Sequence, residues 1–209
     1  GKGVVDMEPV MQVVGLEDET AIPRLVRDCL DYFDANDLQA EGLFRVSGSR
    51  RDVEKILSVY ASRANTGEGK GVDLSGEGEA TVCTLLKDYF RSLPDPLVPY
   101  RHFDTLCALA SQPEAEWLKH SLPLCQDFSP IRRELCLRLF ALLSRVAQHR
   151  EANLMDEANL ARVFAPVLML GEGHSPLEQL TQLNHVIITL ERFIRHYPVL
   201  FENSVDEET

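Results

Sequence analysis

Residues 129–146, SPIRRELCLRLFALLSRV, carry apolar side chains on nearly every face of a helix. Ser129 is a helix-capping residue, and Pro130 suits the first helical position, where its missing N–H is not needed. A helix that is apolar all round needs neighbours on all sides. The stretch therefore predicts a helix at the centre of a helical domain.

Amphipathic helical stripes lie on both sides of this central segment. In each stripe, apolar residues recur every three or four positions, which places them on one helix face. The clearest stripes contain Ile22, Leu25, Val26, Cys29, Leu30 and Phe33; Val53, Ile56, Leu57 and Tyr60; and Val82, Leu85, Leu86, Tyr89 and Leu93. Strand-like alternation is scarce. The pattern predicts an all-α single domain of about eight to nine helices.

The helical periodicity is lost at both ends of the chain. We expect an N-terminal flank at residues 1–19, one domain at 20–201 and an acidic tail at 202–209. The 209 residues suit one good-sized domain. Because residue 1 is glycine and not methionine, we expect the chain to be a piece of a longer protein.

Acidic residues outnumber basic ones. The chain holds 33 Asp and Glu against 21 Lys and Arg, a formal net charge of −12. A nucleic-acid binder needs clustered cations for phosphate contacts, so this balance argues against that class. Residues 1–20 and 202–209 carry nine of the acids and one base, which leaves the domain between them with a net charge of −4. No apolar run reaches the length that spans a bilayer.

Motifs for several kinds of catalysis are missing. Gly69-Lys70 lies in a glycine-rich segment, but Ala64 and Gly71 break the phosphate-loop pattern. The five cysteines and six histidines form no ligand spacing, so we predict no metal site and reduced, buried thiols. No nucleophile elbow surrounds Ser47. A self-contained hydrolase is therefore disfavoured.

Two basic features remain as candidates for function. Arg45 stands between large apolar residues in EGLFRVSG (41–48), on the connection between two predicted helices. Apolar neighbours and flexible glycines can hold such a loop while the arginine points outward. Lys87 and Arg91, four positions apart, lie side by side on one helix face. From local pattern alone, an ordinary solvated arginine and an ordinary solvated helix face remain open as explanations.

Three motifs follow one another along the chain: GLFRVSG (42–48), LLKDYFRSLPDPL (85–97) and NLARVFAP (159–166). In this order and spacing they resemble the RhoGAP domain, the GTPase-activating domain for Rho-family small GTPases, over Thr20 to Phe201. The resemblance implies a GTPase activator of RhoGAP-like helical fold. It also implies that Arg45 is a catalytic arginine finger, inserted into the partner to meet charge on the transferred phosphoryl group.

The same resemblance implies roles for further residues and for a partner. The residues that it places at the partner-facing groove or in support of the loop are Gly42, Phe44, Lys87, Arg91, Asn159, Pro166 and Val167. Among them, Arg91 is expected to brace the Arg45 loop. The partner, a Rho-family GTPase such as Rho or Rac, would supply GTP and magnesium, so no cofactor is expected here. We further expect a cytoplasmic monomer that inserts into no membrane, with any membrane recruitment coming from other parts of a longer protein.

The sequence departs from the family pattern after Pro166, which is itself expected to end or kink its helix. Family members commonly carry an asparagine next, which hydrogen-bonds toward the GTPase and the finger, whereas this chain has Val167. Loss of one such bond costs on the order of 1–3 kcal/mol, or roughly ten- to a hundredfold in rate, so we expect weakened or retargeted activity. Ala165, where glycine is usual, is a milder change. The alternative is a non-catalytic module of the same fold that binds a GTPase or another protein.

Overall fold

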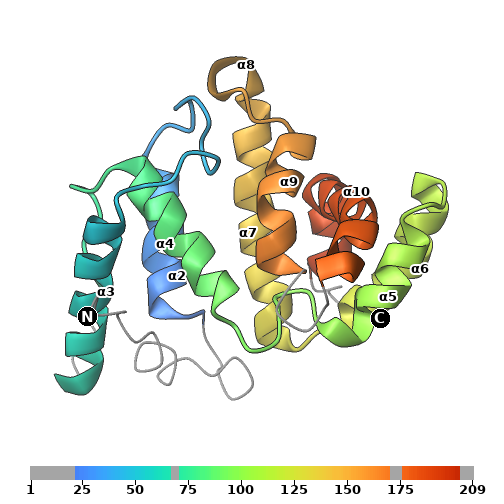
Figure 1. Cartoon of the computed structure of the whole chain (residues 1–209), viewed down its shortest axis with the longest axis horizontal. Helices are drawn as coiled ribbons and strands as arrows, with labels where there is room; N and C mark the ends of the chain where they lie inside the picture. Colours follow the sequence, from blue (N-terminus) through green and yellow to red (C-terminus); the bar gives the residue numbers. More distant parts are fainter. Residues whose placement is uncertain (1–21, 67–70, 170–175, 203–209) are drawn as a thin grey trace, which may run out of the picture.

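The computed structural model describes residues 22–66, 71–169 and 176–202; the predicted flank at 1–19 and nearly all of the predicted tail lie outside these ranges. Within them the chain is all-helical and contains no strand (Figure 1). The helices are α2 (Arg24–Ala35), α3 (Arg50–Thr66), α4 (Glu79–Arg91), α5 (Tyr100–Leu109), α6 (Glu114–Gln126), α7 (Pro130–Gln148), α8 (Arg150–Asn153), α9 (Glu157–Leu168) and α10 (Pro176–Phe201). The predicted fold class is confirmed.

Helix α7 is the central helix, as its apolar sequence predicts. It packs against α2, α8, α9 and α10. In Figure 1 it stands between α2, α3 and α4 on one side and α5, α6 and α10 on the other. Its buried apolar residues are Ile131, Leu135, Cys136, Leu139, Phe140, Leu142, Leu143, Val146 and Ala147. Because these residues cover most of the helix circumference, α7 joins the two halves of the domain.

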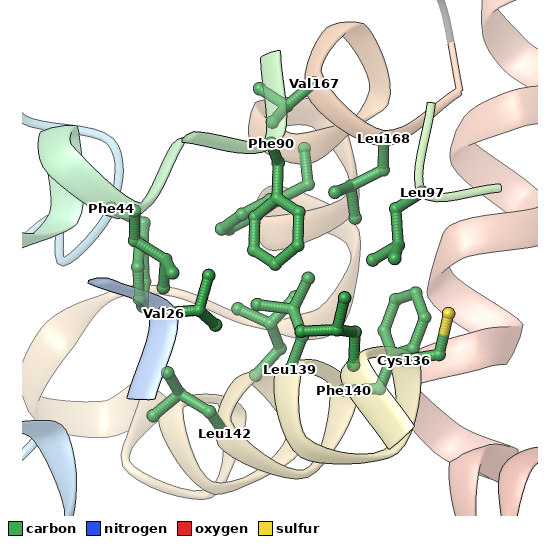
Figure 2. Close-up of a cluster of buried hydrophobic side chains, with 14 of the residues drawn as sticks. Val26, Phe44, Phe90, Leu97, Cys136, Leu139, Phe140, Leu142, Val167 and Leu168 are labelled. Carbon is green, nitrogen blue, oxygen red and sulfur yellow. The ribbon is translucent and has the colours of Figure 1, made fainter. Parts of the chain in front are cut away.

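The core contains side chains from helices that are far apart in the sequence. Figure 2 shows Phe90 of α4, Phe140 of α7 and Leu168 of α9 in one cluster of buried side chains. Phe44, from the connection between α2 and α3, belongs to the same cluster. The five cysteines are also buried and unpaired. Among the residues that the structure describes, no helix is both long and apolar enough to cross a membrane.

Pro166 does not end its helix, since α9 continues to Leu168. Proline at this position removes one N–H near the helix end. The residues around it, Phe164 and Leu168, are fully buried and hold the last turn in place by packing. The Leu168 carbonyl is also satisfied from outside the helix, because it accepts a 3.0 Å hydrogen bond from Val98 N.

Candidate functional site

The segment from Gly42 to Gly48, here called the Arg45 segment, lies on the connection between α2 and α3 and is buried in its first half and exposed in its second. Leu43 and Phe44 are buried, whereas Arg45 and Val46 are exposed. The Phe44 ring packs between Phe33 of α2 and Phe164 of α9, with centroid distances of 5.1 and 5.3 Å. Two apolar anchors therefore hold the segment while the next side chain, Arg45, reaches solvent.

Backbone geometry makes this segment a tight turn around Gly42. Both Gly42 and Phe44 have positive φ angles, of 71° and 68°. The Gly42 carbonyl accepts hydrogen bonds from Arg45 N (2.8 Å) and Val46 N (3.0 Å). A Cβ atom at position 42 would lie 3.0 Å from Val46 Cγ2 and 3.3 Å from the Arg45 guanidinium. Position 42 therefore requires glycine for its backbone angles and for the close approach of these two side chains.

We expect Gly42→Ala to lower the free energy of unfolding by about 1–2 kcal/mol, because a left-handed alanine is strained and its methyl group meets Val46. Urea denaturation measures this loss. Gly76→Ala is the matched control, since a Cβ atom there meets nothing within 4 Å. Equal effects of the two substitutions would contradict the role given to Gly42.

Helix α4 supports the Arg45 segment with two side chains. Lys87 Nζ donates a 2.5 Å hydrogen bond to the Phe44 carbonyl, one peptide away from Arg45. Lys87 is buried, and this burial lowers the pKa of its ammonium group. Thr84 Oγ1 accepts a 2.9 Å hydrogen bond from Gly48 N at the other end of the segment. Helix α4 therefore holds the Arg45 segment at two points, the Phe44 carbonyl and Gly48 N.

Asp88 of α4 forms one ion pair with the first turn of α3 and a second one within α4. The Asp88 carboxylate, only 11% exposed, accepts hydrogen bonds from Arg91 and from Arg50, the first residue of α3. The expected brace by Arg91 therefore reaches the Arg45 segment indirectly, through Asp88 and the start of the following helix. The direct brace is Lys87.

The third support comes from the turn between α8 and α9. The Asn153 carbonyl accepts a 2.8 Å hydrogen bond from Gly42 N. The buried Asn153 side chain donates to the carbonyls of Leu38 and Val146, both at 2.8 Å. Asn153 therefore ties the Arg45 segment to the end of the central helix.

Asn159 lies in the first turn of α9 and completes this support. Its backbone N–H donates to the capping carboxylate of Asp156 at 2.7 Å. Its side-chain amide donates to the Leu154 carbonyl at 3.3 Å and accepts from Arg162 at 3.0 Å. Asn159 thus stabilises the turn after α8, and the Asn153 carbonyl at that turn accepts the hydrogen bond from Gly42 N.

Pro166, which ends the third motif, and Val167, which follows it, differ in burial. Pro166 is exposed, whereas Val167 is only 4% exposed and lies in the core cluster of Figure 2. Val167 therefore packs inside the domain, although the resemblance implies a groove-facing position. A polar residue at 167 would lose this packing.

Three supporting residues were missed by the sequence analysis: Thr84, Asp88 and Asn153. Thr84 and Asp88 follow a polar stripe with Lys87 and Arg91 along one side of α4, and this spacing is a signal that could have found them. Asn153 leaves no such signal, because its partners lie in other parts of the chain. Within the described ranges, no group of three or more His, Cys, Asp or Glu is arranged to hold a metal ion.

The chain is similar in sequence to proteins named Rho GTPase-activating proteins. The family model of the RhoGAP domain matches residues 23–172. Human SLIT-ROBO Rho GTPase-activating protein 3 is 32% identical over 184 residues, 87% of this chain and 16% of the relative. Rat Rho GTPase-activating protein 35 is 31% identical over 189 residues, 88% of this chain and 12% of the relative. The chain therefore spans less than a fifth of the length of these relatives.

Solved structures share the fold. Human Rho GTPase activating protein 15 superimposes with a TM-score of 0.78 at 24% identity, covering 92% of this chain and 89% of that structure. The BH domain of Graf, the GTPase regulator associated with focal adhesion kinase, gives a TM-score of 0.75 at 22% identity, covering 86% and 94%. The helical arrangement of Figure 1 is thus found in two solved proteins.

Proposed function

This chain belongs to the RhoGAP domain family, and from that membership we propose that it stimulates GTP hydrolysis by Rho-family small GTPases. In this proposal Arg45 enters the partner's nucleotide site as an arginine finger, and the chain has no enzymatic activity of its own. The partner brings GTP and magnesium, so the domain requires no cofactor. It acts as a cytoplasmic monomer, and its recruitment to membranes depends on other parts of a longer protein.

The observation that carries the proposal is the exposure of Arg45 on a segment held from three sides. Within the described part of the chain, the Arg45 guanidinium makes no hydrogen bond or ion pair. Its backbone is fixed by the buried Phe44 ring, by Lys87 and by Gly42. A fixed backbone and an unpaired guanidinium are what we expect of an arginine that binds a group on another protein.

The chemistry of GTP hydrolysis requires such a cation. The transition state spreads negative charge over the transferred phosphoryl oxygens and the leaving group. The guanidinium is planar and permanently charged, and it donates in a fork geometry that matches phosphate oxygens. A finger that meets this charge only in the transition state raises the rate of the chemical step.

A single-turnover panel tests the proposed function. Rho-family GTPases loaded with GTP are mixed with rising concentrations of the chain, and phosphate release is followed. We expect acceleration of at least one GTPase to a plateau rate. Absence of acceleration across the whole panel would reject GTPase activation and leave the binding-module alternative.

The departure at Val167 favours a second candidate, a non-catalytic module that binds a GTPase without activating it. A GTPase carrying GDP and aluminium fluoride mimics the transferring phosphoryl group and separates the two. A catalytic finger binds this form much more tightly than the GTP-bound form, whereas a simple binding module binds both alike.

We expect Val167→Asn to leave the plateau rate of hydrolysis unchanged, because the side chain at this position packs inside the domain and does not face the finger. The same change lowers the free energy of unfolding by about 1–3 kcal/mol, because the position is buried. Single-turnover assays and urea denaturation measure the two effects. Val167→Ala loses packing without gaining an amide, so a rate gain in Val167→Asn that Val167→Ala does not share would contradict the inward placement of this side chain.

A further inference from the structure

Two exposed apolar residues, Val46 and Leu154, belong to the Arg45 segment and to the turn that is hydrogen-bonded to it. Among the described residues, the large hydrophobic side chains that are exposed are Val46, Val59, Leu154, Leu177 and Val199. Val46 directly follows Arg45 and is 52% exposed; Leu154 is 51% exposed. Leu154 directly follows Asn153, whose carbonyl accepts the hydrogen bond from Gly42 N. Val46 and Leu154 are therefore both linked closely to Gly42, over which the arginine side chain lies.

Leu154 is held in an unfavourable backbone conformation. Its φ and ψ angles are 59° and 27°, in the left-handed region that glycine and asparagine adopt most readily. Phe44 and Leu154 are the described residues other than glycine with positive φ. Phe44 is buried and its ring packs on two others, but half of the Leu154 side chain faces solvent. The fold thus gains little from a leucine at a position where asparagine would be more stable.

Strained residues that persist near a functional segment point to a role in that function. From this combination we infer that Leu154, together with Val46, forms an apolar contact for the GTPase that receives Arg45, and that Leu154 helps determine affinity for it. This inference rests on the proposed function. The partner is the GTPase itself, because a protein that closes around the Arg45 guanidinium also covers the next residue along the chain and the turn bonded to Gly42.

The contact contributes to binding in the ground state and the transition state alike. An apolar side chain next to the finger is buried when the complex forms, whether or not the phosphoryl group is transferred. Its loss therefore raises the concentration of the chain needed for half-maximal stimulation and leaves the plateau rate unchanged. Burial of a half-exposed leucine corresponds to about a five- to tenfold change in that concentration.

The test is Leu154→Asn in the full chain, with Val199→Asn as the matched control. Val199 is 57% exposed and lies on α10, beyond α7 and α9 from the Arg45 segment in Figure 1. We expect Leu154→Asn to raise the half-maximal concentration about five- to tenfold with the plateau rate kept. Its melting temperature should equal that of the parent or exceed it by about 2–4 °C, because asparagine relieves the backbone strain. The control should leave the half-maximal concentration unchanged.

A second readout separates failure of this inference from failure of the proposed function. Binding of each variant to GTPases loaded with a non-hydrolysable GTP analogue reports the contact without catalysis. If the parent binds without accelerating hydrolysis, the proposed function falls, and the loss or retention of affinity in Leu154→Asn still decides the contact. An unchanged affinity of Leu154→Asn overturns the inference. If its melting temperature is also lower than that of the parent, Leu154 has a structural role. A parent that binds no GTPase overturns both proposals.

Discussion

Arg45→Ala is expected to lower the plateau rate of GTP hydrolysis that the chain stimulates in its partner GTPase by roughly 10³-fold or more, the usual contribution of an arginine finger. The melting temperature should stay that of the parent, because the side chain is exposed and makes no hydrogen bond or ion pair within the described residues. Affinity for the GTP-bound GTPase should also change little. Single-turnover phosphate release at saturating concentrations measures the rate separately from binding.

Two further arginine variants sharpen this experiment. Arg45→Lys keeps the charge but loses the planar fork, so we expect an intermediate plateau rate. Arg138→Ala removes a positive charge from an exposed arginine on α7 that pairs with Glu134, and it should leave the plateau rate unchanged. Full activity in Arg45→Ala would show that this residue is not the finger.

Lys87→Met is expected to have the second largest effect, a fall of about ten- to a hundredfold in the plateau rate. Lys87 donates to the Phe44 carbonyl, and Phe44 directly precedes the finger. Methionine has similar length and no donor, so the carbonyl loses its partner and the peptide before Arg45 is free to turn. A misplaced finger reduces the rate of the chemical step even in a saturated complex.

Stability changes less than activity in this variant because two effects oppose each other. Loss of the hydrogen bond leaves a carbonyl unsatisfied, at a cost of about 1–3 kcal/mol. Removal of a buried ammonium, whose pKa is already lowered by burial, offsets part of that cost. Urea denaturation should therefore show a decrease of no more than about 2 kcal/mol. Lys119→Met, an exposed position on α6, is the control and should affect neither quantity.

A double-mutant cycle shows whether Lys87 acts through Arg45. If Lys87 positions the finger, Lys87→Met has no further effect on the plateau rate in a chain that already carries Arg45→Ala. Additive losses would mean that Lys87 contributes to the reaction separately from the finger, and the positioning role would be rejected.

Much of the site was predictable, since its main residues lie in continuous motifs. Arg45 was a candidate because apolar residues and glycines flank it, and Lys87 because it shares a helix face with Arg91. Arg91 was expected to brace the loop, and its hydrogen bond goes to Asp88, which also accepts from the first residue of α3. The choice between two neighbouring cations depends on which side of α4 meets the Phe44 carbonyl, and that is a property of packing.

Packing also decided the structure around Pro166 and Val167. Pro166 was expected to interrupt its helix from its covalent structure alone, but packing around Phe164 and Leu168 carries α9 through it. Val167 was expected at the groove or in support of the loop, and its side chain lies in the core. The spacing of residues on a helix predicts which of them share a face; it does not say which neighbour that face meets.

The sequence by itself determined the all-helical class, the central place of α7 and the exposure of Arg45 between apolar anchors, because periodicity and flanking residues act over one or two helix turns. Only the tertiary structure decided what holds Arg45 in place. The bonds from Lys87 to Phe44, from Gly48 to Thr84 and from Gly42 to Asn153 join segments distant in the chain. Such hydrogen bonds form only when packing of the core brings the helices together. The local sequence pattern therefore cannot predict them.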